Sequence, residues 1–587
     1  QESISGLYAQ QKNSVSISSG VSAEQITRSP DRSTSEVLKR VSGASIQDNK
    51  FIVVRGLSDR YNSSSLNNAV LPSTEPDRKA FSFDIIPSNL VDKIVINKTA
   101  APNLPGDFAG GMVQVITKDV PDQSFLGFST TWGYNSQSTN KDFISNERNS
   151  NDWLGFDDGT RSLPSNFPQT RQEYSPLSIQ EKVSYTKTVG NLYPEKRYTA
   201  MPVQSYQLTW GDRSTFKNSA SLGSIISLNY RNSQNINLVT RRDYENNFIN
   251  TYYDYDDNEY RYSTTLGGLA NFTYKKGGNK FSLKNLFNRT FEDAYTDREG
   301  FNTNVDGNIR FNNSDLTQRT VFNTQLEGDH QVGENDNKLN WNLSYSLTSR
   351  SQPDLRSIYY RQSFGTPDAA FEIVDRNSRR FYSDLDENSY SGQVNYTTNI
   401  KILGDKSSLK TGLMKMYRNR QFGARIFQYR HNPTGSKSYD DLIITQPKDV
   451  IFSDFNINEN GGFYLEEFTQ NTDKYDAQTD LNAGYIMLDN NIGKHLRASW
   501  GARVEHYFQN IDVTDLSGTG RTYDQTFFDV LPSLNLTYSL SDEANLRLSA
   551  SRTVNRPELR ELAPFAFYDF VTQTSTLGNP ELKRGQI

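Results

Sequence analysis

A two-residue alternation of apolar and polar side chains is the feature that most restricts how this chain folds. In the segment 338–348, for example, Leu339, Trp341 and Leu343 alternate with polar residues. Because successive side chains of a strand point to opposite faces, each such segment predicts a strand with one apolar face. Thirteen segments of this kind are found at 125–134, 203–211, 221–230, 265–275, 280–289, 321–330, 338–348, 391–402, 408–417, 479–489, 495–507, 530–540 and 544–552.

Two β architectures share this alternation, a soluble sandwich with the apolar face inward and a membrane barrel with that face toward lipid. The segments 338–348 and 495–507 have the length of about 9–11 residues that a tilted strand needs to cross a bilayer. Short links at 212–220, 276–279, 331–337, 403–407, 490–494 and 541–543 alternate with long polar segments at 135–202, 231–264, 292–320, 349–390, 418–478 and 508–529. This asymmetry favours an outer-membrane barrel with short turns on one side and long loops on the other. A secreted glycan-binding β-protein remains the soluble alternative.

The composition agrees with a barrel. Only 34% of the 587 residues are hydrophobic, yet 12% are aromatic, and an outward apolar belt about 25 Å tall needs few apolar residues. No run of 18 apolar residues occurs, which excludes a transmembrane helix. A net charge of −5 gives no footprint for nucleic acid, and the chain has no cysteine.

The first part of the chain has a different pattern. After an N-terminal linker at 1–24, residues 25–121 read as an α+β domain with strands at 51–54, 93–96 and 112–116. Ser33 and Glu36 have the spacing of a capping box, which predicts a helix with Val37 and Leu38 on its apolar face. A second short helix is predicted to begin at 87–88.

The segments 35–43, 51–57 and 106–118 resemble the plug domain of TonB-dependent outer-membrane receptors. The segments 153–159, 531–538, 546–552 and 578–582 resemble the barrel of the same family, so the resemblance covers essentially the whole chain. It implies an α+β plug, residues 25–121, inside an antiparallel transmembrane barrel of 22 strands that begins at residue 122. Thirteen strands cannot close an antiparallel barrel, and we therefore expect the polypeptide to continue beyond Ile587.

The resemblance also implies a function and partners. A substrate of unknown identity would bind to extracellular loops in the outer membrane, and TonB of the inner-membrane complex would pull on the plug to import it. No convincing TonB box is found before Ser33, and we expect the carboxypeptidase-regulatory-like domain of related receptors to be missing. The segments 71–78 and 104–111 depart from the SusC-like branch, which weakens the case for a SusD-like lipoprotein partner. The alternative is a non-transporting scaffold that binds outer-membrane lipids, lipoproteins or other assembly partners.

Two sets of plug residues are candidate functional positions. Arg55 and Gly56 end a predicted strand, where they form either a gating contact with the barrel wall or a turn held by a salt bridge. Gly106, Asp107, Gly110 and Gly111 form a second motif, whose glycines are expected to supply turn dihedrals that other residues cannot adopt. These glycines are predicted to be structural.

An acidic and aromatic run lies in a predicted extracellular loop. It comprises Tyr253, Asp254, Tyr255, Asp256, Asp257 and Glu259. Clustered carboxylates are ligands for Ca²⁺, and tyrosines stack on sugars or partner proteins, but a solvated loop is the alternative interpretation. The segment 302–313 has Asn313 where a calcium loop needs glutamate, so Asp306 and Gly307 are predicted to form a turn.

Catalytic patterns have no support in the sequence. The four histidines, His330, His431, His495 and His506, lack metal-ligand spacing, and no Gly-x-Ser-x-Gly or phosphate-binding motif occurs. We therefore expect neither enzymatic activity nor a metal or cofactor.

Overall fold

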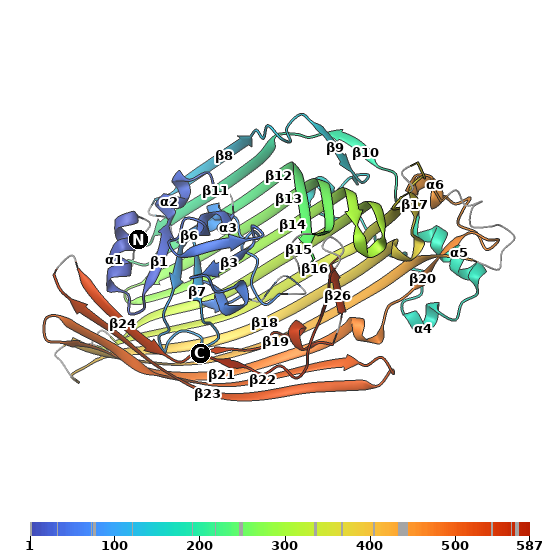
Figure 1. Ribbon diagram of the computed structural model, residues 1–587. Helices are drawn as coiled ribbons and strands as arrows, with labels where there is room; N and C mark the ends of the chain where they lie inside the picture. The colour runs from blue at the N-terminus through green and yellow to red at the C-terminus, as the bar shows by residue number, and fades with distance from the viewer. Residues whose placement is uncertain are drawn as a thin grey trace.

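The computed structural model describes residues 3–31, 33–71, 73, 75, 78–119, 121, 123–190, 192–217, 219–245, 250–333, 337–365, 368–402, 406–432, 444–541, 544–564, 566–569 and 574–587. Its main feature is one long antiparallel sheet that curves around an N-terminal domain (Figure 1). No helix in this described part of the chain is long and apolar enough to span a membrane.

Thirteen strands follow one another along this sheet, and each lies on one of the thirteen predicted segments. They are β8 (Phe125–Gly133), β11 (Val203–Thr215), β12 (Ser221–Tyr244), β13 (Thr251–Lys276), β14 (Asn279–Asn302), β15 (Gly307–Val332), β16 (Asn337–Ser363), β18 (Arg379–Ile400), β19 (Lys406–His431), β21 (Lys474–Ile492), β22 (Leu496–Thr514), β23 (Gly520–Ser539) and β24 (Asn545–Ser551). Two short strands, β17 (Glu372–Ile373) and β20 (Phe463–Glu467), pair with β16 and β19. The fold class predicted from the alternation is confirmed.

The strands extend well beyond the alternating segments. The pairing of β13 with β14 is unbroken from Lys276 and Asn279 to Tyr253 and Asn302, across stretches predicted to be loops. Backbone hydrogen bonds continue there although the side-chain pattern is no longer apolar on one face. The placement of residues 253–259 in an extracellular loop was therefore wrong, because they belong to β13. The turn predicted at Asp306 and Gly307 is present between β14 and β15.

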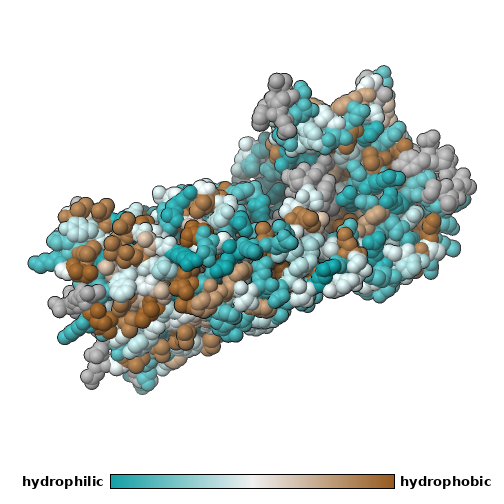
Figure 2. Space-filling model, turned by 60° about the horizontal axis from the view of Figure 1, so that its bottom comes forward, coloured by the Kyte–Doolittle hydropathy of each residue, from teal (hydrophilic) through white to brown (hydrophobic). Residues whose placement is uncertain are grey.

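The outward face of the wall carries an exposed apolar belt. Leu126, Leu228, Leu413 and Ile486 expose between 54% and 73% of their surface, which is unusual for isolated core-type residues in a soluble protein. Hydrophobic side chains gather over one end of the molecule in Figure 2, while the other end is mainly hydrophilic. Outward aromatic residues border the belt at Trp210, Tyr274, Trp341, Trp500 and Tyr538 near the short turns, and at Trp132, Tyr206, Tyr230, Tyr345, Tyr390 and Tyr417 farther along the strands. Two such girdles are typical of membrane barrels.

The N-terminal domain contains a five-stranded sheet in the order β1-β6-β7-β4-β5. Its strands are β1 (Ser18–Ser22), β6 (Val91–Asn97), β7 (Gly111–Thr117), β4 (Asn62–Leu66) and β5 (Ala69–Val70), and a separate hairpin joins β2 (Ala44–Gln47) to β3 (Phe51–Val54). The stretch 1–24, predicted as a linker, contains α1 (Ile4–Asn13) and β1, which pairs with β6. Helix α2 (Ala23–Arg28) follows.

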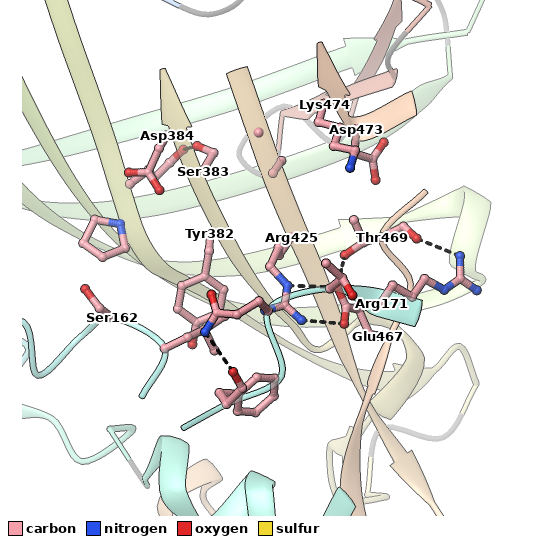
Figure 3. A pocket seen from close by; sticks show the side chains of 18 of the residues that line it. Ser162, Arg171, Tyr382, Ser383, Asp384, Arg425, Glu467, Thr469, Asp473 and Lys474 are labelled. Atoms are coloured by element: carbon pink, nitrogen blue, oxygen red, sulfur yellow. Dashed lines mark hydrogen bonds and ion pairs between the residues drawn. The ribbon is translucent and has the colours of Figure 1, made fainter. Parts of the chain in front are cut away.

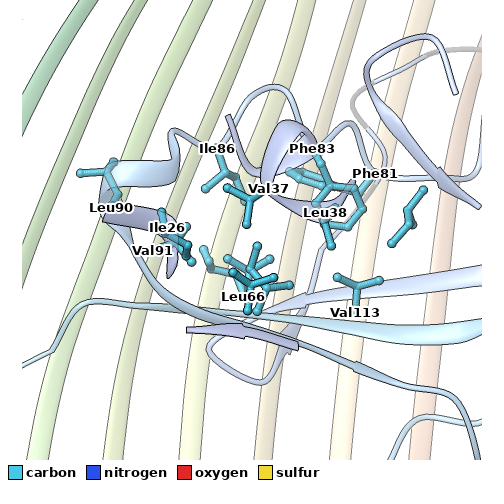
Figure 4. Close-up of a cluster of buried hydrophobic side chains, with 14 of the residues drawn as sticks. Ile26, Val37, Leu38, Leu66, Phe81, Phe83, Ile86, Leu90, Val91 and Val113 are labelled. Carbon is cyan, nitrogen blue, oxygen red and sulfur yellow. The ribbon is translucent and has the colours of Figure 1, made fainter. Parts of the chain in front are cut away.

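The core of this domain packs against the inner face of the wall (Figure 4). Val37 and Leu38 of α3 (Thr34–Leu38) are fully buried in it, and Ser33 Oγ caps this helix by accepting a hydrogen bond from the Glu36 amide at 3.4 Å. The helix predicted at 87–88 is a 3-10 turn, Ser88–Leu90. Three residues of the wall join the same cluster: Ile225, Leu269 and Leu286. The domain is therefore seated inside the curved sheet.

Residues 135–190 and 192–202, here called the outer strap, lie on the outward face of the extended strands. The strap contains β9 (Asp142–Ser145), paired with β10 (Lys196–Thr199), and the helices α4 (Arg171–Tyr174) and α5 (Ile179–Val189). Phe143 of the strap packs with Tyr262 and Phe291 of the wall, and Phe167 packs with Phe427. By strand alternation these wall residues face the same side as the apolar belt. The strap thus covers the wall where the belt ends.

Candidate functional site at the interface between the N-terminal domain and the wall

A buried charge cluster joins the N-terminal domain to β15. Arg319, which is 1% exposed, has Nη1 3.0 Å from Glu75 Oε1 and 3.4 Å from Asp84 Oδ2, both in the N-terminal domain. Arg350 of β16 lies 3.7 Å from Glu75, and Glu292 of β14 lies 4.0 Å from Arg319. Burial alone would raise the pKa of Glu75, but Arg319 and other nearby cations outweigh it and hold this pKa below its usual range. The charged form of Glu75 therefore depends on the neighbouring cations.

A second contact is made by residues 553–562, here called the inner strap, which follow β24 and include β25 (Val554–Asn555) and α7 (Leu559–Leu562). The Val554 amide donates to the Gly106 carbonyl at 3.0 Å, and the Arg556 amide donates to Asp107 Oδ1 at 3.1 Å. Lys79 Nζ donates to Asp107 at 2.8 Å and to the Asn555 side chain at 3.0 Å. These hydrogen bonds connect one side of the inner strap to the N-terminal domain.

The other side of the inner strap is fastened to the wall. The Arg556 guanidinium lies 2.7 Å from Glu505 and 2.8 Å from Asp529. Glu558 lies 3.0 Å from Arg420, whose side chain is fully buried. The inner strap also returns to the N-terminal domain, because Glu561 and Arg60 form an ion pair of 2.8 Å. It therefore connects the enclosed domain to the wall through charged groups, while Leu559 and Leu562 are buried in an apolar cluster with wall residues.

The predicted motif around Gly106 lies at this contact, but its glycines act differently from the prediction. Gly106, Gly110 and Gly111, all within the described residues, have no positive φ. A Cβ on Gly106 would lie 2.2 Å from Leu531 Cδ1 of the wall, and one on Gly110 would lie 2.2 Å from Asn62 Oδ1. At both positions glycine allows a close approach of a neighbouring side chain rather than supplying a turn dihedral. The Gly106 amide also donates to Glu505 Oε1 at 3.1 Å.

Arg55 and Gly56 do form the predicted strand-ending turn, with φ of 54° and 76°. The Arg55 guanidinium donates to the carbonyls of Lys98 at 2.6 Å and Gly110 at 2.9 Å, and at 3.4 Å to that of Ala109. These bonds lie within the N-terminal domain and involve carbonyls rather than the predicted salt bridge. Gating by Arg55 through the barrel wall stays a prediction.

The acidic run of β13 is neutralised by arginines. Asp257 accepts two hydrogen bonds from Arg298, at 2.6 and 2.8 Å, and one from Arg241 at 2.7 Å. Asp254, Asp256 and Glu259 accept from Arg242, Thr240 and Arg241, and Tyr253 stacks on Tyr255 with ring centroids 4.5 Å apart. Among the described residues, no three His, Asp or Glu side chains are grouped to hold a metal ion. These contacts connect β13 to the neighbouring strands β12 and β14.

A cavity of about 670 Å³ lies between the N-terminal domain and the wall, on the side away from the short turns. Lys50 and Arg78 of the domain line it together with Arg241, Glu259 and Arg261 of the wall. The turn between β2 and β3 closes one side. We call this space the inner cavity.

A separate pocket of about 540 Å³ opens between the outer strap, β18 and the link from β20 to β21 (Figure 3). Arg425 donates to both oxygens of Glu467, at 3.0 and 2.7 Å, and Arg171 donates to the Thr469 carbonyl at 2.7 Å. Burial raises the pKa of Asp473 to about 6, although the Gln470 amide and Arg171 act in the opposite direction. This pocket holds paired charges outside the wall.

Apart from Gly106 and Asp107, the residues of these contacts were not identified from the sequence. Glu75 and Arg319 are 244 positions apart, and no local pattern connects them. The inner strap did carry a local signal, since Leu559 and Leu562 have helical spacing, with Glu558 and Glu561 in a capping arrangement.

Residues 9–113 match the model of the TonB-dependent receptor plug domain, and residues 434–584 match an outer membrane protein beta-barrel family. In these two parts the chain resembles the TonB-dependent outer-membrane receptors. The N-terminal domain is accordingly the plug, and the sheet is the barrel wall, integral to the outer membrane. The short turns then face the periplasm, and the extended strands with the outer strap face the exterior.

Solved structures of receptors and transporters share the fold. The siderophore receptor PiuA from Acinetobacter baumannii aligns with a TM-score of 0.53 at 11% identity, covering 98% of this chain and 68% of its own. The ferripyoverdine receptor of Pseudomonas aeruginosa gives 0.51 at 12% identity, with 92% and 57% covered. The hemophore receptor HasR of Serratia marcescens gives 0.50 at 11%, with 98% and 69% covered. The chain thus spans between 57% and 69% of these receptors. A search of curated proteins finds no match.

Proposed function

We propose that this receptor imports a substrate across the outer membrane by movement of the plug, and that TonB supplies the energy for this movement. The observation that carries the proposal is the nature of the plug contacts. The plug is joined to the wall by ion pairs at Arg319 and along the inner strap, as well as by the apolar contacts of its core. These ion pairs can separate when the plug moves only if water reaches the freed charges, because a buried charge without its partner is strongly unfavourable.

The inner cavity is the proposed entry site for the substrate. It lies on the exterior side of the plug and has a mixed-charge lining, with the cations Lys50, Arg78, Arg241 and Arg261 beside the acids Asp48, Glu75 and Glu259. A substrate bound there contacts both plug and wall, so binding can alter their relative position. Helix α1 lies at the opposite, periplasmic end, where Arg497 of the wall donates to the Asn13 carbonyl at 2.8 Å. A pull from the periplasm would reach the plug at that end.

Uptake by cells with and without TonB tests this proposal. Solved relatives are described as receptors for a siderophore, for ferripyoverdine and for a hemophore with heme, so iron carriers are the first substrates to assay. We expect radiolabelled iron to accumulate only when both the receptor and TonB are present. Replacing Arg241 with Gln is expected to weaken uptake, and replacing the exposed Arg310 with Gln serves as a matched control. If the protein still performs its role in the cell when TonB is missing, the scaffold function would be supported instead.

A further inference from the structure

The outward wall of the barrel carries two apolar grooves that meet at Gly392. The first, of about 760 Å³, crosses the wall from β16 to β22, and the second, of about 540 Å³, crosses from β14 to β19. Leu343, Gly392 and Lys415 line both grooves. These side chains belong to the belt between the aromatic girdles, so the grooves open toward membrane lipid.

The strand register explains the position of the grooves. Leu343, Gly392, Lys415, Asn482 and His506 are direct partners on five adjacent strands and therefore form one outward row across the wall. Gly392 leaves a gap in this row between Leu343 and Lys415. A Cβ on Gly392 would lie 3.2 Å from Leu343 Cδ2, which shows how closely the neighbouring side chain leans into the gap.

The next row toward the periplasm has a gap of the same kind. It consists of Trp341, Val394, Leu413, Gly484 and Val504. A Cβ on Gly484 would lie 3.3 Å from Leu413 Cδ2. Two glycines, one in each row, therefore form the floor of the first groove. Apart from Lys415, Asn482, His506 and Gln393, the residues that line it are apolar or glycine.

Lys415 places a cation where the two grooves meet. Its side chain is 64% exposed, and Nζ lies 3.1 Å from Asp480 Oδ2 at the exterior end of the belt. A charged group on the lipid-facing surface is costly at the bilayer midplane, but the stem of lysine lets its ammonium reach the interface. Tyr390 and Tyr417, one row farther toward the exterior, line the second groove at the level of the girdle. Lipid head groups lie at that level.

We propose that the two grooves together bind one anionic phospholipid with at least two acyl chains. One chain lies in each groove, and the phosphate lies beside the Lys415 ammonium. A lipid fits this surface better than a protein partner, because the grooves are apolar, lie within the membrane belt and meet at the exposed Lys415 side chain. The site is independent of substrate import and lies on the opposite side of the wall from the inner cavity.

Native mass spectrometry of the full chain in detergent, after removal of bound lipid, tests the site. The protein is titrated with dioleoyl phosphatidylglycerol and, separately, with dioleoyl phosphatidylcholine, which has the same chains and no net charge. We expect the first phosphatidylglycerol to bind about fivefold more tightly, the effect of one lysine near an anionic head group. In Lys415→Gln this preference should disappear. Equal binding of the two lipids by the unaltered receptor would overturn the proposal.

Filling the grooves gives the second arm of the test. The double variant Gly392→Val with Gly484→Val should weaken binding of both lipids several-fold. Gly268→Val is the matched control, since Gly268 faces outward on β13 and its Cβ would make an ordinary 3.5 Å contact with Leu228. Circular dichroism establishes that each variant retains its β-sheet. A loss as large in the control as in the double variant, or a change in oligomeric state without a change in lipid binding, would contradict the site.

Discussion

Replacing Arg319 with methionine is expected to loosen the plug while leaving the barrel folded. The change removes the positive charge that lies 3.0 Å from Glu75 and 3.4 Å from Asp84. Both carboxylates then remain in the interface, close to the third carboxylate, Glu292, without this partner. Removing one partner of a buried ion pair costs about 3–5 kcal/mol, because the other partner remains charged and desolvated. A cost of about 3 kcal/mol raises the population of the displaced plug roughly 150-fold.

Hydrogen exchange measures this effect directly. Amides of β7 in the plug should exchange about 100-fold faster in the variant, while those of the barrel strands should not change. Arg310→Met is the matched control, since Arg310 lies on the same strand and pairs with Glu299 at a site where both side chains are more than half exposed. Such a pair contributes at most about 1 kcal/mol. Equal exchange in the two variants, or acceleration throughout the barrel, would refute the reasoning.

Two further changes test the plug contact and the outer pocket. Gly106→Ala should destabilise the seated plug by about 1–3 kcal/mol, because its Cβ would meet Leu531 at 2.2 Å, whereas Gly423→Ala, which enters open space, should leave plug protection unchanged. The pKa of Asp473 is raised from 3.8 to about 6, so the folded state holds a proton that the unfolded state has lost between these values, and stability falls as pH rises through that range. The total loss is about 3 kcal/mol, and protection factors of residues 467–474 should show it in the unaltered receptor but not in Asp473→Asn.

The barrel strands were predicted well from the sequence where one strand face contacts lipid and must therefore be apolar. Leu413 and Ile486 alternate with polar neighbours because one face of their strands meets the membrane, and all thirteen strands were found from this pattern. Outside the membrane, the alternation of apolar and polar residues no longer marks the strands. Tyr262 and Phe291 face outward there but are covered by the outer strap, so the strands continue without a clear alternation.

The plug contacts could not be predicted for a different reason. Glu75 and Arg319 come into contact only because the plug lies inside the barrel. The chain has 63 basic and 68 acidic residues, so the sequence allows many equivalent pairs. The importance of Gly106 was visible in the motif, but its cause was not. Its close approach to Leu531 joins positions that are 425 residues apart and is apparent only in the fold.

A reversible cross-link between plug and wall tests the central claim most directly. The chain has no cysteine, so Thr99→Cys with Asn535→Cys, at a plug–wall pair whose side-chain oxygens lie 3.2 Å apart, introduces one specific pair of thiols. Uptake should stop when this pair is oxidised and return when it is reduced, while each single variant transports under both conditions. Unchanged uptake with the cross-link fully formed would contradict import by movement of the plug.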